Sequence, residues 1–406
     1  MLSGVTITKG KGGLGKQDAT ADMIMGLLMH GIAVSGWALN VPKKLYSVDD
    51  AEQLGIDANY DTTNNVLCHY HISEFFRMNP NGQLWVMMVA QSTIVANMLD
   101  ITLTNVPAKQ LLVAANGEIN VLGVAMNKGT SYTPTLLTGL DTQIVAAIPK
   151  AEALADDEWT AHRPVHIVLE GASFNGTVAA ALNLRAQAAP SVSVVIAQDN
   201  DVANISTAYA GYAAVGTMLG VLSAAKVSEN IGWVEKFPLT DVANGDWVNP
   251  GFSNKQLLGY FSLADYTTLH GKGYIMPRLY AGNPNAYFND DHTCTLITDD
   301  YAQIIENRTI NKAAKLVYAA LLPQTNGAVP VDSTGKMTPE FVSGLESRGE
   351  APLDDMKRND DLSDKKIYID PAQNVVSNST IACKIRVIPM GCSRVINVDL
   401  ALAASF

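Results

Sequence analysis

The residues that come closest in type and spacing to a known chemical site lie near the start of the 406-residue chain. Gly10, Gly15 and Lys16 reproduce the G-x-x-x-x-G-K spacing of a P-loop, in which backbone N–H groups and a lysine surround phosphate oxygens. A P-loop continues with a Ser or Thr hydroxyl that holds Mg²⁺, whereas Gln17 stands here, and we expect a helix over residues 22–31. Two interpretations stay open: a P-loop-like nucleotide-binding ATPase, and a flexible glycine hinge after a terminal strand. The hinge glycines are Gly10, Gly12, Gly13 and Gly15.

Two groups of side chains are of the types that bind metal ions. The first group is Asp290, Asp291, His292, Cys294, Asp299 and Asp300. The second is Cys68, His69 and His71. Neither group is accompanied by a second cluster with ligand spacing, and no Ser–His–Asp or Cys–His arrangement can be read from the sequence. We therefore expect no metal, no cofactor and no enzymatic activity.

The composition narrows the possible partners. The net charge is −11 and the sequence has no long basic run, so we expect no nucleic-acid partner. Hydrophobic residues make up 48% of the chain and charged residues only 17%, which indicates that some surface is buried against other subunits.

The start lacks the pattern of a signal peptide, and four scattered cysteines suit a reducing compartment. The uncharged segment 202–225 is rich in small residues and predicts a buried helix, not a membrane insertion.

The middle of the chain alternates short apolar runs with helical stretches. Near-continuous apolar strands of this kind are typical of an α/β domain whose sheet is covered on both faces. The expected strands are 83–90, 119–126, 165–171, 192–199 and 231–237.

The last third predicts a helix, exposed loops and a hairpin. Residues 304–323 have apolar residues at helical spacing and end at Pro323. The opposite side of this helix carries a basic stripe of Arg308, Lys312 and Lys315. A short helix is expected at 338–349, and alternating apolar residues predict two strands, 380–389 and 394–404, joined by a turn.

Both chain ends carry strand patterns that need partners. The first is Val5, Thr6, Ile7 and Thr8, and the second has Val395, Ile396, Val398, Leu400 and Leu402. Strands at the two ends of a chain leave edges that must pair with something. If they pair with other copies of the protein, they join the copies by β-augmentation.

Several segments together resemble the tail sheath proteins of contractile phage tails and related injection systems. Residues 43–56 are similar to a sheath segment in which a short strand leads into a Ser-initiated helix ending in Leu-Gly. Residues 71–90 look like the following helix, turn and strand, with Phe75, Phe76 and Gly82 in the matching places. Residues 307–323 resemble the late Arg-containing helix of these proteins, and 384–402 resemble their terminal hairpin.

This resemblance implies an α/β fold: a central α/β sandwich domain plus a C-terminal α+β sheath domain, with extended N- and C-terminal β-arms. The implied divisions are an N-terminal arm with the glycine hinge at 1–20, an α/β domain at 21–290, a sheath domain at 291–390 and a C-terminal arm at 391–406. Val5 to Thr8 and Arg394 to Leu402 would be strands donated to the C-terminal domains of neighbouring subunits.

The resemblance also implies a function and partners. Sheath subunits form a helical homo-oligomer of stacked rings around an inner tube, and contraction of the cylinder drives the tube through a target envelope without ATP. Arg308, Lys312 and Lys315 would then face an acidic inner tube protein. Further implied partners are baseplate and terminator proteins. The particle would be assembled in the bacterial cytoplasm as part of a virion tail or an injection system.

Overall fold

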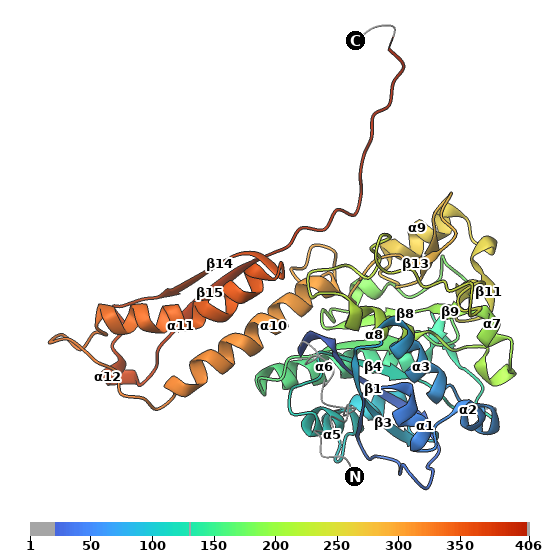
Figure 1. Cartoon of the computed structure of the whole chain (residues 1–406), viewed down its shortest axis with the longest axis horizontal. Coiled ribbons are helices and arrows are strands. Elements are labelled where there is room, and N and C mark those ends of the chain that lie inside the picture. The colour runs from blue at the N-terminus through green and yellow to red at the C-terminus, as the bar shows by residue number, and fades with distance from the viewer. Residues whose placement is uncertain (1–20, 130, 404–406) are drawn as a thin grey trace, which may run out of the picture.

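A six-stranded sheet lies at the centre of the larger part of the molecule. The computed structural model describes residues 21–129 and 131–403 (Figure 1). The strand order is β2-β3-β1-β4-β7-β8, with β2 antiparallel to β3 and the other neighbours parallel. The strands are β1 (Ile24–Gly31), β2 (Lys43–Leu45), β3 (Gln83–Ala90), β4 (Val121–Ala125), β7 (His166–Glu170) and β8 (Val192–Val195).

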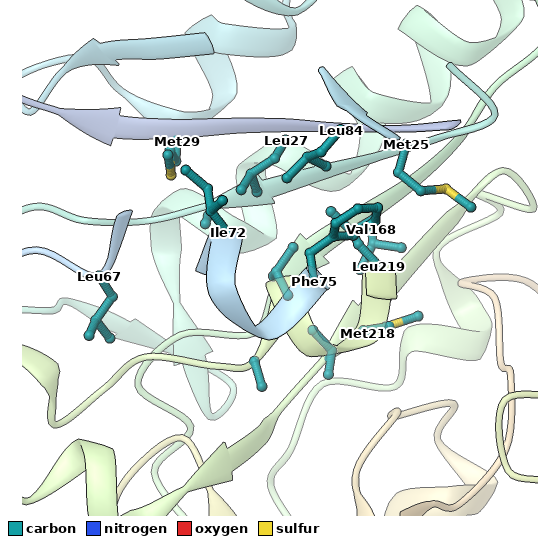
Figure 2. Packing of buried hydrophobic residues seen from close by; sticks show 14 of the residues in the cluster. Met25, Leu27, Met29, Leu67, Ile72, Phe75, Leu84, Val168, Met218 and Leu219 are labelled. Carbon is teal, nitrogen blue, oxygen red and sulfur yellow. The ribbon is translucent and has the colours of Figure 1, made fainter. Parts of the chain in front are cut away.

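Helices cover both faces of this sheet, because alternate side chains of each strand point to opposite sides. On one face Leu27 packs in a core with Phe75 and Leu219, as Figure 2 shows. On the other face Leu28 packs with Leu111. The first face is covered by α1 (Val48–Gln53), α2 (Ala58–Asn64), α3 (Cys68–Met78) and α8 (Val215–Ala224). The second is covered by α4 (Val95–Leu99), α5 (Pro107–Ala114) and α6 (Thr142–Thr160).

The helix expected over residues 22–31 is wrong. After a short 3₁₀ turn, η1 (Ala21–Met23), the chain forms β1, all eight residues of which are buried. A strand buried on both faces is apolar throughout, so its periodicity cannot be told from that of a buried helix. The glycines Gly10 to Gly15 lie outside the described residues, but the element that follows them is a strand. The strand–loop–helix layout of a P-loop is therefore not supported.

Four of the five expected central strands are present. Residues 83–90, 119–126 and 165–171 contain β3, β4 and β7. The run 192–199 is divided into β8 and β9 (Ala197–Asp199). Within the described chain residues 231–237 form turns and no strand, although Ile231 and Phe237 are buried.

Smaller elements surround the sheet. β9, β10 (Pro250–Phe252) and β11 (Gln256–Leu257) form a three-stranded sheet. Two hairpins pair β5 (Leu136–Leu137) with β6 (Leu140–Asp141) and β12 (Pro277–Leu279) with β13 (Ala286–Phe288). The remaining helices of this part are η2 (Leu184–Ala186), α7 (Asn200–Ala203), η3 (Thr207–Tyr209), η4 (Leu258–Tyr260) and α9 (Leu263–Gly271). The helix expected over 202–225 is thus confined mainly to α8, and none of the described helices meets the length and apolarity that a membrane crossing requires.

The C-terminal part is an elongated lobe on one side of the α/β domain (Figure 1). It contains α10 (Ile304–Leu321), η5 (Leu322–Gln324), α11 (Pro339–Arg358), β14 (Leu362–Ile369), α12 (Val375–Asn378) and β15 (Cys383–Pro389). Leu353, Leu362 and Ile367 form its small core with Ala313. The helix predicted at 304–323 is confirmed as α10, whereas the one expected at 338–349 is the first half of the longer α11.

The hairpin predicted between 380–389 and 394–404 is wrong in its second strand. β15 pairs antiparallel with β14, with Ile367 opposite Ile385, and the described residues 390–403 form no helix or strand. They run away from the body as an extended C-terminal segment (Figure 1). The strand pattern near the C-terminus therefore has no partner within the described part of its own chain.

Candidate assembly interface

The C-terminal arm, residues 391–403, presents a row of aliphatic side chains to solvent. Val395, Ile396, Val398, Leu400 and Leu402 are each between 75% and 106% exposed. A contiguous exposed apolar segment is unfavourable in water because its side chains lack apolar contacts, and its peptide groups are free to pair with another strand. Within the described part of the chain these side chains have no packing partner. The other predicted arm, Val5 to Thr8, lies outside the described residues.

A surface of the right kind to receive a strand is present in the same chain. β14 and β15 form a sheet of two strands, and no third strand of the described residues pairs with either. A two-stranded sheet has a free edge on each side, and such an edge presents a row of backbone N–H and C=O groups for another strand. Tyr368 and Ile388, one from each strand, are about half exposed.

The root of the arm is held by ion pairs. Arg394 Nε lies 3.2 Å from Asp290 Oδ1, and Arg394 Nη2 lies 3.2 Å from Asp291 Oδ1. The amide of Asn230 donates to both carboxylates, at 2.5 and 2.6 Å. These groups border a cavity of about 1020 Å³, which the arm residues 391–396 close on one side. Arg394 therefore attaches the root of the arm to a buried carboxylate pair.

Burial and charge pairing oppose each other at this root, and burial together with the neighbouring Asp290 raises the pKa of Asp291 well above its usual range. Burial alone would raise the pKa of Asp290, but nearby His292, a hydrogen bond from Asp291 and the charge of Arg394 hold that pKa below its usual range. For Arg394, burial works against the charged form, yet the two carboxylates raise the pKa of the guanidinium. Arg394 and Asp290 are thus both charged at neutral pH, and their attraction acts in a partly desolvated site.

Among the described residues, the potential ligand atoms of Asp290 and His292 from the first predicted metal group lie close together, and His270, which sequence spacing did not indicate, joins them. The ligand atoms of these three residues lie within 4.8 Å of one another. Arg185 Nη2 lies 2.6 Å from His292 Nδ1, so this nitrogen must accept, and the ring proton is on Nε2. His292 Nε2 then donates to His270 Nδ1, 3.0 Å away. The nitrogen that would bind a metal is already protonated, so the geometry favours a hydrogen-bonded chain over a metal centre.

We expect that zinc added to the purified protein leaves its melting temperature unchanged. Burial lowers the pKa of His292 to about 3, so the imidazole is neutral, but its free lone pair is engaged by Arg185. A ligand that binds only the native state raises the melting temperature, which differential scanning fluorimetry detects. A saturable rise with zinc would contradict the tautomer assigned here.

The second predicted metal group is not a site. Cys68 donates to the carbonyl of His30, His69 pairs with Glu52, and His71 accepts from the backbone of residue 216. The three side chains thus have separate partners, and within the described residues they form no group with ligand atoms close enough to share a metal ion.

Side-chain hydrogen bonds cross the place where an α/β sheet of this type usually binds a ligand. Such ligands bind at the carboxyl ends of the strands where the strand order reverses, which here lies between β1 and β4. Asn127 donates to the carbonyl of His30 and accepts from the backbone of Leu67 at this point, and Cys68 also donates to His30. A cavity of about 430 Å³ lies beside these contacts, and Leu67, Asn127 and residues that follow β4 and β7 line it.

The basic stripe of α10 is not exposed, which corrects the expectation from the sequence. Arg308 is only 3% exposed and donates to the carbonyls of residues 225 and 226, at 3.2 and 3.3 Å. Lys315 Nζ lies 2.9 and 3.1 Å from the carbonyls of residues 117 and 119. Lys312 Nζ lies 2.5 Å from Asp22 and 2.6 Å from Asp361. Periodicity marks the polar side of a helix, but it cannot tell whether that side faces water or a second domain.

Comparisons with known proteins agree with this architecture. The family model of the DUF2586 N-terminal domain matches residues 2–292, and that of the DUF2586 C-terminal domain matches residues 300–406. No curated protein matches the sequence.

Solved structures of sheath proteins share the fold over nearly the whole chain. The anti-feeding prophage helical sheath in its contracted state is 13% identical, with a TM-score of 0.62, and the match covers 100% of this chain and 99% of that one. The PVC sheath complex of an extracellular contractile injection system, also contracted, is 11% identical, with a TM-score of 0.59 and coverage of 100% and 98%. A sheath tail protein from Desulfitobacterium hafniense is 10% identical, with a TM-score of 0.51 and coverage of 95% and 100%. The resemblance to tail sheath proteins is confirmed, and the chain belongs to the DUF2586 family.

Proposed function

We propose that the protein is a structural subunit of a contractile tail sheath, which polymerises into a helical cylinder around an inner tube and contracts to drive that tube through a target envelope. One observation carries the proposal: the same chain has an exposed apolar arm without a partner and a two-stranded sheet with free edges. The fold shared with sheath proteins from contractile injection systems supports it.

In the proposed lattice each subunit donates its arm to the β14–β15 sheet of a neighbour. Residues 394–402 would add one strand by β-augmentation, in which main-chain hydrogen bonds supply affinity and alternate side chains supply specificity. Val5 to Thr8 would add a second strand on the other edge, with the glycines Gly10 to Gly15 as the hinge between strand and body. Because every subunit both gives and receives strands, the contacts extend into a continuous mesh.

Contraction in this proposal is a change of lattice with the mesh retained. Subunits slide and rotate as rigid bodies from a metastable extended arrangement to a better-packed one, and the packing difference supplies the work. The inner tube, the baseplate and a terminator are the proposed partners. Arg308, Lys312 and Lys315 are engaged within the subunit as folded, so we do not assign the tube contact to them.

Electron microscopy of the purified protein tests the function. We expect hollow, striated cylinders, because a subunit with complementary arms and edges continues to add copies in a helical, open-ended arrangement. The inner tube protein, when expressed together with this chain, should be found inside the cylinders. A subunit that stays monodisperse at high concentration, with and without the tube protein, would overturn the proposal.

A further inference from the structure

We infer that helix α10 holds the roots of both chain ends through one ion-pair clamp at each, so that it sets the directions of the two arms together. The inference rests on the proposed function, because it assigns a role to the arms in assembly. The C-terminal clamp is Arg394 with Asp290 and Asp291. The N-terminal clamp is Lys312 with Asp22 and Asp361.

The C-terminal clamp connects the arm to the first turn of α10. Asp291 accepts from the backbone of Ile304 through its carbonyl, at 2.8 Å, and from the backbone of Ile305 through its carboxylate, at 2.9 Å. Gln303, the N-cap residue, makes no side-chain capping hydrogen bond within the described residues, so Asp291 satisfies these amides in its place. The same carboxylate binds Arg394. One side chain thus holds both the start of the helix and the root of the arm.

The N-terminal clamp lies about two turns further along the same helix, roughly 12 Å away. Lys312 bridges Asp22, which lies in η1 just before the central strand β1, and Asp361, which immediately precedes β14. It therefore ties the point at which the first 20 residues join the body to the beginning of the sheet proposed to receive arms. Only 20% of the Lys312 side chain and 3% of the Asp361 side chain are exposed, so water screens this contact weakly.

Arg308 lies between the two clamps and fixes the helix against the α/β domain. It donates to the carbonyls of residues 225 and 226, which follow α8, and its charge interacts with Asp22, Asp361 and Asp291. Sliding α10 along its axis would break these hydrogen bonds, the clamp at Lys312 and the hydrogen bonds by which Asp291 holds the first turn of the helix. When the subunit rotates as a rigid body, the roots of both arms then move together with it. The proposed contraction requires this, because the strand contacts between subunits must be kept while the lattice changes.

The experiment measures the direction of each arm with pairs of spin labels in the full-length chain. Cysteines replace Asn397 in the C-terminal arm and Gln17 in the N-terminal segment, each combined with Thr267→Cys on the exposed side of α9. Cys383→Ser and Cys392→Ser remove the two native thiols that are not buried. Double electron–electron resonance then gives a distance distribution for each pair in the unassembled subunit.

Two clamp variants are compared with two matched controls. Arg394→Gln and Lys312→Met remove one clamp each. Arg278→Gln removes a guanidinium that borders the same cavity and stacks on Tyr280, and Lys150→Met removes a lysine whose partner is Asp100 on the surface. We expect Arg394→Gln to increase the width of the distance distribution for the C-terminal arm at least about twofold, and Lys312→Met to do the same for the N-terminal segment. Both variants should also lower the yield of sedimentable cylinders. The controls should match the unsubstituted protein in both measurements.

The outcomes separate this inference from the proposed function. If the unsubstituted protein forms cylinders and the clamp variants keep narrow distributions, the clamps do not direct the arms and the inference is overturned. If the unsubstituted protein forms no cylinders, the proposed function fails, whatever the distributions show. Arg394→Lys guards against simple misfolding, because it keeps the charge but not the two-pronged contact. The distance distribution of the C-terminal arm should be narrower in Arg394→Lys than in Arg394→Gln. Equal widths in the two variants would contradict a role of the Arg394 charge in directing the arm.

Discussion

Truncation after Arg394 abolishes polymerisation and leaves a folded subunit: this is the largest effect that we expect. The truncated chain keeps the clamp residue and loses the five exposed aliphatic side chains from Val395 to Leu402. Burying a large aliphatic side chain is worth about 1.5–3 kcal/mol, so the loss per arm contact is roughly 7 kcal/mol or more. Because 1.4 kcal/mol is about a factor of ten, each contact weakens by more than roughly ten-thousand-fold.

A single substitution tests the same arm without shortening it. Val398→Asp places a charge in the middle of the proposed donated strand, where a buried carboxylate has no counter-ion. Leu263→Asp, at the start of α9, is the matched control, because Leu263 is 79% exposed and Val398 is 78% exposed. Sedimentation and electron microscopy measure the polymer, and circular dichroism shows that the subunit is folded. Normal cylinders from Val398→Asp would remove the arm from the assembly contact.

The N-terminal arm is tested by the same assay with residues 1–16 deleted. The deletion removes Val5 to Thr8 and the hinge glycines, and it leaves Asp22, which Lys312 binds. We expect the loss of cylinders from a soluble subunit. Cylinders of normal length would show that one arm is sufficient and that the second edge of the β14–β15 sheet has another partner.

The strands of the central sheet could be predicted from the sequence where a short apolar run lies between turn residues. The prediction was wrong for β1, which is buried along its whole length. β3 and β7 stand between turn residues and have the length of strands, so their type could be read from the apolar run. β1 has the same composition but follows a glycine loop, and the familiar order of a P-loop favoured a helix there. Only the parallel pairing of β1 with β3 and β4, a contact between distant segments, decides its conformation.

Only part of the candidate interface could be predicted from the sequence. The alternation in the last residues predicted a strand, but the described residues 390–403 form none and leave their apolar side chains exposed. The predicted pairing of this segment with β15 was wrong, because β15 pairs with β14 instead. β14 shows no apolar run in the sequence, since it carries Asp364, Lys365 and Lys366 and is buried at only a few positions. His270 was missed since it lies on α9, far from His292 in sequence, and the spacing of single histidines holds no signal.

The polar side of α10 illustrates a limit of the same kind. Its cations were expected to face a partner protein, and instead they bind carbonyls of the subunit's own α/β domain and the carboxylates of Asp22 and Asp361. A buried face of a helix is usually apolar, so a charged face that packs against a second domain resembles a solvated one. Only the positions of Asp22 and Asp361, brought next to Lys312 by the fold, reveal the difference.

Gly216→Ala is the substitution for which we expect the largest loss of stability in the α/β domain. α8 approaches α3 through Gly216 and Gly220, which lie on the same side of the helix because they are four residues apart. A methyl group at position 216 would lie 2.2 Å from the carbonyl oxygen of His71, and one at position 220 would lie 2.7 Å from that of Phe75. Both obstacles are backbone atoms of a packed helix, so α8 must move away from the sheet core shown in Figure 2.

We expect Gly216→Ala to destabilise the fold by about 3 kcal/mol, the cost of forcing extra volume into a close-packed core. Gly344→Ala is the control, because Gly344 lies within α11 and a methyl group there meets no atom within 4 Å. That control should instead stabilise the protein by roughly 0.5–1 kcal/mol, the usual gain of alanine over glycine in a helix. Thermal melting of the two full-length variants gives the comparison. The carbonyls that accept hydrogen bonds from Arg308 follow α8 directly, so displacement of α8 should also weaken the attachment of α10. Equal melting temperatures of Gly216→Ala and the unsubstituted protein would show that α8 and α3 can separate without loss of stability.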